Sequence, residues 1–203
     1  MAISRRVGHD PSGPPRTHPN LPRQGYASAM GPRLFLGHGA SGTAASMAPF
    51  VEGLRARGVN AIAIDLPRRK AEDALPAFHA VVPSTADVAV GGHSYGGRVA
   101  SLAAAEPDAP YAALVCFSFP LHPPGGPERT DARIAHWPAI RCPVLLLSGE
   151  SDPFARIELL RASVSRIPRA ELVTYPRLGH TLKPVLDDAL DRAAAFLLAL
   201  PGG

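Results

Sequence analysis

The stretch that decides the fold is GGHSYGGR, residues 91–98, which follows an apolar run and precedes an alanine-rich segment. Within it, Gly92-His-Ser94-Tyr-Gly96 matches the pattern G-x-S-x-G. This pattern is typical of a serine on a very tight turn between a strand and a helix, in a strained conformation that exposes its hydroxyl. Side chains two positions either side would collide, which explains the glycines. The setting favours a nucleophile at Ser94, and the alternative is a glycine-rich turn with an exposed serine.

The chain on both sides of this stretch alternates between short apolar runs and helical patterns. Such alternation is the signature of βαβ units and a parallel sheet. We expect strands at residues 33–36, 60–64, 87–90, 112–119, 144–147 and 171–175. We expect helices at about 41–57, 68–82, 97–105, 155–166 and 184–200. The sequence therefore predicts an α/β fold in which helices flank a six-stranded parallel sheet.

The loops after the last two predicted strands carry an acid and a base. In open α/β sheets, ligands bind beyond the carboxyl ends of the strands. LSGESDPF, residues 147–154, offers Glu150 and Asp152, and Asp152 is favoured because it precedes a proline and a new helix, where it can also act as an N-cap. YPRLGHTLK, residues 175–183, places His180 before the final helix. Because a serine needs a base oriented by a third group, this order predicts a catalytic triad of Ser94, Asp152 and His180.

The loop after the first predicted strand permits two interpretations. Gly37-His-Gly39-Ala-Ser-Gly42 fits G-x-G-x-x-G, the dinucleotide fingerprint, and Asp65 closes the next strand, where a ribose-binding acid is sought. That interpretation leaves the triad candidates unexplained. In the second interpretation, this loop supplies one amide of an oxyanion hole, predicted to be that of Ala40. The residue after the nucleophile, Tyr95, supplies the other. The residues expected around the substrate pocket are Gly39, His93, Leu121 and His122.

Taken together, these motifs resemble the α/β-hydrolase superfamily. The segments that carry the resemblance are HGASG, GGHSYGGR, FSFPLHPPGGPE, IRCPVLLLSGESDPF and LGHT, spread over about residues 33–200. More narrowly, the chain is similar to the small lidless hydrolases related to the testis-expressed hydrolase of animals and to a subunit of the NSL histone acetyltransferase complex, near the dienelactone-hydrolase-like group. The run Phe119–Gly125 is the most specific part. The resemblance implies a minimal α/β-hydrolase fold with no cap domain and no metal or organic cofactor.

Two departures limit what the resemblance implies. No apolar run before residue 33 predicts the first two antiparallel strands of the usual eight. The dienelactone hydrolases carry cysteine where Ser94 stands. The predicted function is a serine hydrolase that cleaves a small-acyl ester or thioester. Only about 25 residues separate the fourth and fifth strands, which leaves no room for a helical cap and predicts a shallow, open pocket. The alternative is a non-catalytic binding or scaffold module, the role of the acetyltransferase-complex relative.

Composition excludes several other classes. The 203 residues suit one domain at 32–203, and residues 1–31, with five prolines and four glycines, are predicted to be a disordered leader. Most of the formal charge of +4 lies in residues 1–32, where four arginines face one aspartate. The remainder has no basic face, which argues against nucleic acid.

The remaining expectations concern compartment, partners and metals. No stretch approaches the roughly 20 apolar residues of a membrane span. Cys116 and Cys142 are predicted to be buried free thiols, which fits a reducing cytoplasm. We expect a small-molecule ester as partner, with the chain a monomer or homodimer. His38 and His93 flank the candidate site beside His180, but their loops lack metal-ligand spacing, so we expect no zinc.

Overall fold

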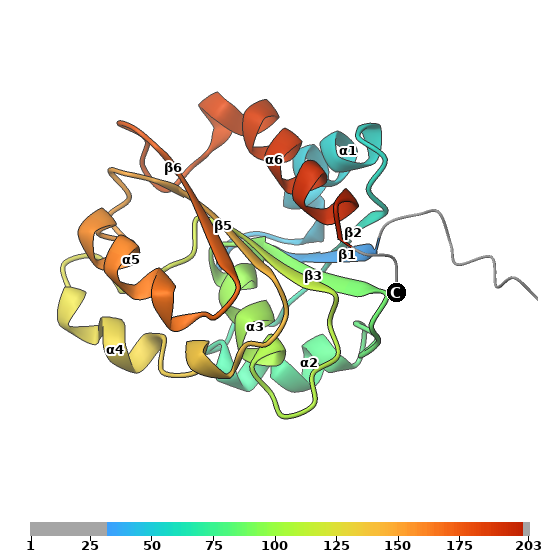
Figure 1. Cartoon of the computed structure of the whole chain (residues 1–203), viewed down its shortest axis with the longest axis horizontal. Helices are drawn as coiled ribbons and strands as arrows, with labels where there is room; N and C mark the ends of the chain where they lie inside the picture. The colour runs from blue at the N-terminus through green and yellow to red at the C-terminus, as the bar shows by residue number, and fades with distance from the viewer. Residues whose placement is uncertain (1–31, 201–203) are drawn as a thin grey trace, which may run out of the picture.

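One parallel sheet forms the centre of the molecule (Figure 1). The structure, a computed structural model, describes residues 32–200, so the predicted leader at 1–31 lies outside the described residues. The sheet has the order β2-β1-β3-β4-β5-β6, and each neighbouring pair is parallel. Its strands are β1 (Arg33–Gly37), β2 (Ala61–Ile64), β3 (Val88–His93), β4 (Ala113–Phe117), β5 (Val144–Gly149) and β6 (Ala170–Tyr175). The predicted six-stranded parallel sheet is confirmed.

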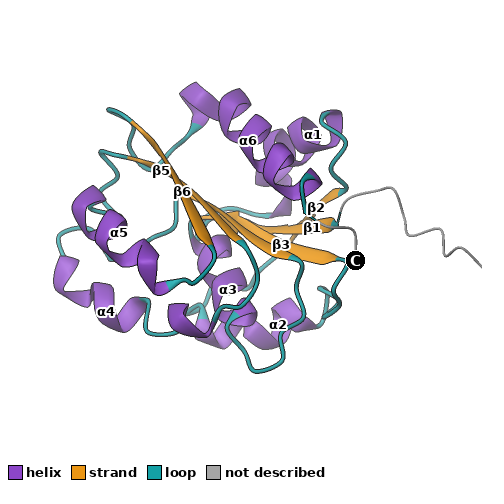
Figure 2. Ribbon diagram, in the orientation of Figure 1, coloured by secondary structure: helices purple, strands orange, loops and turns teal. Residues whose placement is uncertain are grey.

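Helices cover both faces of this sheet, as Figures 1 and 2 show. One face carries α1 (Ala48–Ala56) and α6 (Leu186–Leu198), and the other carries α2 (Leu75–His79), α3 (Tyr95–Ala104), α4 (Thr130–Arg133) and α5 (Ile157–Ser163). Side chains of a strand point alternately to the two faces. In β1, Leu34 and Leu36 accordingly join the core under α1 and α6, while Phe35 joins the core on the opposite face. Burial on both faces explains why these strands appear in the sequence as continuous apolar runs.

The order in which strands are added to the sheet changes direction between β1 and β3. From β1 the chain passes through α1 to β2 on one side, then returns across the sheet to β3 on the other side. Such a topological switch point opens a crevice at the carboxyl ends of the two strands. The loop after β1 and the turn after β3 therefore lie side by side, although more than 50 residues separate them in the sequence.

The connection from β4 to β5 packs against the sheet and forms no cap domain. It contains α4, where the sequence suggested only a long loop. Ile134, Trp137 and Ile140 from this connection are fully buried in the core on the α3 face. The connection therefore covers part of one sheet face, where burial removes its apolar side chains from water. Within residues 32–200, no helix combines the length and apolar character needed to cross a bilayer.

Two cysteines and one arginine lie in or beside this core. Cys116 and Cys142 are both buried free thiols, as expected, and burial raises both of their pKa values. Arg98, on α3, pairs with Glu72 and also donates to the carbonyl of Arg133 at 2.7 Å. It therefore ties α3 to the segments on either side of it.

His136 is a titratable group in the same region. Its Nε2 lies 2.8 Å from Oγ of Ser101, whose own hydroxyl donates to the carbonyl of Arg98 at 2.7 Å. The imidazole therefore donates through Nε2–H. Burial, with a smaller contribution from the Arg98 guanidinium, lowers the pKa of His136 to about 4. Ser101 is only 1% exposed, so this second Ser–His pair is closed to a substrate.

This shifted pKa leads to an expected pH dependence of stability. Since the unfolded chain binds a proton at His136 near pH 6.5 and the folded chain only near pH 4, the stabilisation is complete above pH 6.5 and is lost as the pH falls through this window. Between pH 7.5 and 5 the free energy of unfolding should fall by about 2 kcal/mol from this group. Urea unfolding at the two pH values measures the loss, and His136→Gln should make it smaller by that amount. An identical pH dependence in His136→Gln would contradict the assignment.

Candidate active site

The turn after β3 holds Ser94 in a strained backbone conformation. Ser94 has φ 52° and ψ −113°, values that few residues other than glycine adopt, and its amide donates to the carbonyl of Phe117 at 2.9 Å. A Cβ atom at Gly92 or Gly96 would collide with the carbonyl oxygen of Gly37 on β1. The two glycines of the G-x-S-x-G pattern are therefore required by the close approach of β1 to the turn. As a result, the Ser94 side chain stands at the carboxyl edge of the sheet.

Ser94, His180 and Asp152 form one continuous chain of hydrogen bonds. His180 Nε2 lies 2.7 Å from Ser94 Oγ, and His180 Nδ1 lies 2.8 Å from Asp152 Oδ2. Because a carboxylate only accepts, Nδ1 carries the imidazole proton and Nε2 faces the serine hydroxyl with a lone pair. Asp152 is 4% exposed, whereas the side chain of His180 retains 22% exposure. The three residues come from the loops after β3, β5 and β6, as the sequence predicts.

The structure also shows which of the two acids in the loop after β5 contacts His180. Glu150 Oε1 accepts hydrogen bonds from Arg161 at 2.6 Å and from Thr174 at 2.8 Å, so its carboxylate is occupied away from the histidine. Asp152 Oδ1 accepts the amide of Phe154 at 2.8 Å. The suggested N-cap role for Asp152 is wrong, since α5 begins only at Ile157. Asp152 instead makes an Asx turn that leaves its second oxygen for His180.

The aromatic surroundings of His180 hold its ring in place. The Phe154 ring packs on it with centroids 4.4 Å apart, and the His93 ring lies 5.3 Å away. His93 Nε2 also lies 3.4 Å from the carbonyl of His180. Burial lowers the pKa of His93, and the neighbouring His180 contributes in the same direction. A neutral His93 therefore supports the ring and the backbone of His180.

The loop after β1 runs alongside the Ser94 turn. A Cβ atom built on Gly39 would lie 4.0 Å from Ser94 Cβ and 3.1 Å from His93 Nδ1. Ala40, the next residue, is exposed, and Tyr95 begins α3. Within residues 32–200, neither the Ala40 nor the Tyr95 amide donates to a backbone carbonyl. Two unengaged N–H groups therefore flank the nucleophile candidate.

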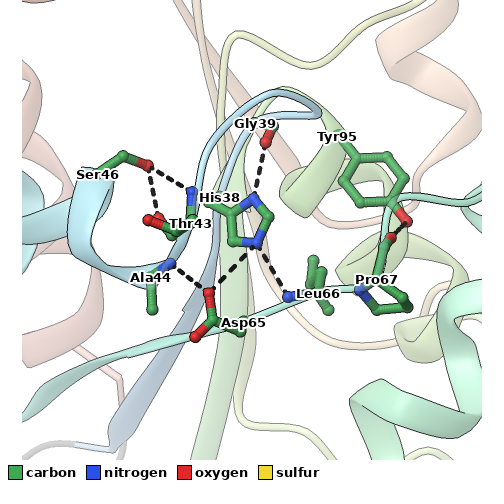
Figure 3. A network of polar contacts seen from close by, with 9 residues as sticks. All are labelled: His38, Gly39, Thr43, Ala44, Ser46, Asp65, Leu66, Pro67 and Tyr95. Atoms are coloured by element: carbon green, nitrogen blue, oxygen red, sulfur yellow. Dashed lines mark hydrogen bonds and ion pairs between the residues drawn. The ribbon is translucent and has the colours of Figure 1, made fainter.

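Asp65 occupies the position that a nucleotide phosphate would need. In a dinucleotide site, the phosphate lies on the amides at the start of the helix after the glycine loop. Here Asp65 Oδ1 accepts the amide of Ala44, the first residue of the 3₁₀ turn Ala44–Met47, at 2.7 Å (Figure 3). The helix α1 begins only at Ala48. A carboxylate at this point repels a phosphate, so the geometry disfavours the dinucleotide interpretation of Gly37–Gly42.

The four residues expected around the pocket lie in different places. Gly39 and His93 border the Ser94 turn, as described above. Leu121 is fully buried in the core on the α3 face, where its side chain packs among apolar residues. His122 is 4% exposed, with Nδ1 2.8 Å from the carbonyl of Pro123 and Nε2 accepting the amide of Arg156 at 3.0 Å. Its ring therefore links two loops.

A cavity of about 420 Å³ lies beside the acid loop. It is bordered by segments of 122–127 and 150–158, including His122 and Asp152. Neither Ser94 nor His180 lines it. Elsewhere in the described part of the chain, no group of three or more His, Cys, Asp or Glu side chains gathers in a way that suits a metal ion.

His38 and Asp65 are the residues whose contacts the sequence did not reveal. His38 is 2% exposed and joins the loop after β1 to the segment after β2. A histidine directly after an apolar strand was a weak signal, since a ring in that position is equally suited to a surface. Its partner is a backbone amide 28 residues away, which leaves no trace in the sequence.

A parallel sheet with this switch point, a strained serine and a histidine–carboxylate pair at successive strand ends defines the α/β-hydrolase class. The chain belongs to this family: the family model described as "Alpha/beta hydrolase domain" matches residues 31–197. No curated protein sequence matches the chain.

Solved structures share the fold at low sequence identity. Esterase 2 of Thermogutta terrifontis, phosphorylated by paraoxon, is 18% identical with a TM-score of 0.67, and 84% of each chain is covered. The monoacylglycerol lipase of Paleococcus ferrophilus is 16% identical with a TM-score of 0.69, covering 84% of this chain and 96% of the lipase. The thioesterase domain from the curacin biosynthetic pathway is 16% identical with a TM-score of 0.64, covering 85% and 92%. Identities this low show the fold alone.

Proposed function

We propose that the chain is a serine hydrolase that cleaves a small-acyl ester or thioester through an acyl-enzyme intermediate. The observation that carries the proposal is the chain of two hydrogen bonds, 2.7 and 2.8 Å long, from Ser94 through His180 to the buried Asp152. A nucleophile, a base in the correct tautomer and an orienting acid are the parts that such chemistry needs. The names of the structural neighbours, two of them an esterase and a thioesterase, are in keeping with this.

In the proposed reaction, Ser94 Oγ attacks the carbonyl carbon while His180 Nε2 takes the hydroxyl proton. The tetrahedral oxyanion accepts hydrogen bonds from the amides of Ala40 and Tyr95. His180 then returns the proton to the leaving alcohol or thiol, which leaves an acyl group on Ser94. Water, deprotonated by the same nitrogen, attacks this acyl group, and collapse of the second tetrahedral intermediate frees the acid and the serine.

The substrate class follows from the architecture around the nucleophile. Apolar side chains of the β4–β5 connection pack into the core, and within residues 32–200 this connection forms no cap domain over Ser94. We propose that the acyl group is small, since a long chain would gain little burial here. The run Phe119–Gly125 supports placing the chain with the small lidless hydrolases that resemble the testis-expressed and NSL-complex proteins.

A series of p-nitrophenyl esters tests this proposal. We expect kcat/KM to reach its maximum by butyrate and not to rise further up to dodecanoate, because each added methylene stays in water and gains none of the roughly 0.8 kcal/mol that burial would give. Release of p-nitrophenol at matched concentrations measures it. A maximum at dodecanoate would contradict the open pocket. Absence of turnover with every ester would instead favour the binding-module alternative.

A further inference from the structure

His38 is a buried connector whose two ring nitrogens both contact backbone. Its Nε2 accepts the amide of Leu66 at 3.0 Å, and its Nδ1 lies 2.7 Å from the carbonyl oxygen of Gly39 (Figure 3). Because the Leu66 amide can only donate, Nε2 is unprotonated and Nδ1–H donates to Gly39. The ring therefore has no nitrogen left for a substrate or a metal.

The contact with Gly39 fixes the direction of the next amide. The Gly39 carbonyl accepts both His38 Nδ1–H and the amide of Gly42, the latter at 2.9 Å. In a planar trans peptide, the C=O and the following N–H point in opposite directions. With its carbonyl held by two donors inside the loop, the Gly39–Ala40 peptide must turn the Ala40 N–H outward. This peptide borders the Ser94 turn, as the position of Gly39 shows.

The segment after β2 contacts the second amide donor as well. The Tyr95 hydroxyl donates to the carbonyl of Pro67 at 2.8 Å, directly beyond Leu66 (Figure 3). Burial raises the pKa of Tyr95, so its phenol stays protonated and keeps donating. Asp65 completes the connection, because its carboxylate accepts the Ala44 amide at 2.7 Å. Three consecutive residues thus hold the loop after β1 and the start of α3.

We propose that Asp65–Pro67 is a brace that positions both amides of the oxyanion hole, with His38 as the positioning residue for the Ala40 amide and the Tyr95 phenol as the anchor for its own backbone amide. The inference rests on the proposed function. Amide donors stabilise an oxyanion best when they are aimed before the reaction, since no energy is then spent on reorienting them. Losing the brace should therefore slow acylation and leave substrate binding nearly unchanged.

Three variants of the full chain test the brace. His38→Phe keeps a ring of similar size but removes both polar contacts, and we expect kcat for p-nitrophenyl acetate to fall about 10- to 100-fold with KM changed less than about threefold. Tyr95→Phe removes only the anchor and should lower kcat about 3- to 10-fold. His136→Phe is the matched control, because it replaces a half-buried histidine and removes its contact with Ser101 outside the site. Its kcat should stay at the wild-type value.

Hydrogen exchange gives a readout that does not depend on turnover. In His38→Phe, the amides of Leu66 and Gly42 should exchange at least about tenfold faster. The Leu66 amide loses its acceptor, His38 Nε2, and the Gly42 amide donates to the Gly39 carbonyl, which His38 no longer holds in place. They should be unchanged in His136→Phe. If His38→Phe does not fold, His38→Asn, which retains a donor near Gly39 but not the acceptor for Leu66, is measured in its place beside Tyr95→Phe.

The outcomes separate the brace from the proposed function. Wild-type turnover with an unchanged kcat in a folded His38 variant would overturn the brace alone. Failure of the wild type to hydrolyse any ester would count against the proposed function, and the exchange of Leu66 and Gly42 would then decide on the brace. Unchanged protection of these amides in the His38 variant would overturn it.

Discussion

Replacing Ser94 by alanine is expected to lower kcat for p-nitrophenyl acetate by a factor on the order of 10⁴ to 10⁶. In the proposed mechanism the variant loses the oxygen that forms the acyl intermediate, while His180 and Asp152 keep their mutual hydrogen bond. Alanine removes a single oxygen from a residue that is not fully buried, so the fold should tolerate it. The measurement is steady-state release of p-nitrophenol, with circular dichroism as the check on folding.

Ser101→Ala is the matched control for this change. Ser101 also contacts a histidine, His136, at 2.8 Å, but it is buried on α3 and its hydroxyl donates to a backbone carbonyl. Its replacement should leave kcat within about twofold of the wild type and affect stability only. Loss of activity in Ser101→Ala with full activity in Ser94→Ala would move the chemistry to the other pair and refute the assignment.

Replacing Asp152 by asparagine is expected to lower kcat by about 10³- to 10⁴-fold. The asparagine carbonyl can still accept the Phe154 amide, which leaves its NH₂ group facing His180 Nδ1. The imidazole must then accept at Nδ1 and carry its proton on Nε2, so the nitrogen that faces Ser94 can no longer take a proton. Because the side chains are isosteric, the effect should appear in kcat and hardly in the melting temperature.

Glu150→Gln distinguishes the two acids of this loop. Glu150 binds Arg161 and Thr174, and none of its contacts reaches His180. We expect kcat to change by less than about threefold, with a small loss of stability from the weakened ion pair. A large loss of kcat in Glu150→Gln together with an active Asp152→Asn would show that the wrong carboxylate was chosen.

Apolar runs and their spacing were enough to predict the number of strands and the fold class, because a doubly covered parallel sheet needs such runs. The bounds were less predictable. The third strand was expected to end at Val90, since Gly91 and Gly92 suggest a turn, yet β3 continues to His93. A Cβ atom at Gly91 would collide with the carbonyl of Val115 on β4, so this glycine allows two strands to approach closely. Glycine is required both at a turn and where two strands approach closely, so its presence in the sequence does not distinguish the two.

The candidate site was predictable where the fold fixes the order of its parts. Strand ends gather at one edge of the sheet, so Ser94, Asp152 and His180 could be assigned together from their positions after three strands. Contacts between side chains and distant backbone could not be assigned in this way. His38 depends on the Leu66 amide and Asp65 on the Ala44 amide, and neither partner has a side chain that marks the contact. The burial of Leu121 was not predictable for a related reason, since only packing decides which way a loop residue points.

Labelling by an organophosphate tests the central claim, that Ser94 is an activated nucleophile, most directly. Paraoxon is the reagent for this test, because an organophosphate transfers its phosphoryl group to an activated serine. Intact mass should show one diethylphosphoryl group on the wild type, peptide mapping should place it on Ser94, and Ser94→Ala should remain unmodified. Folded wild-type chain that takes up no phosphoryl group, or label that persists in Ser94→Ala, would contradict the account.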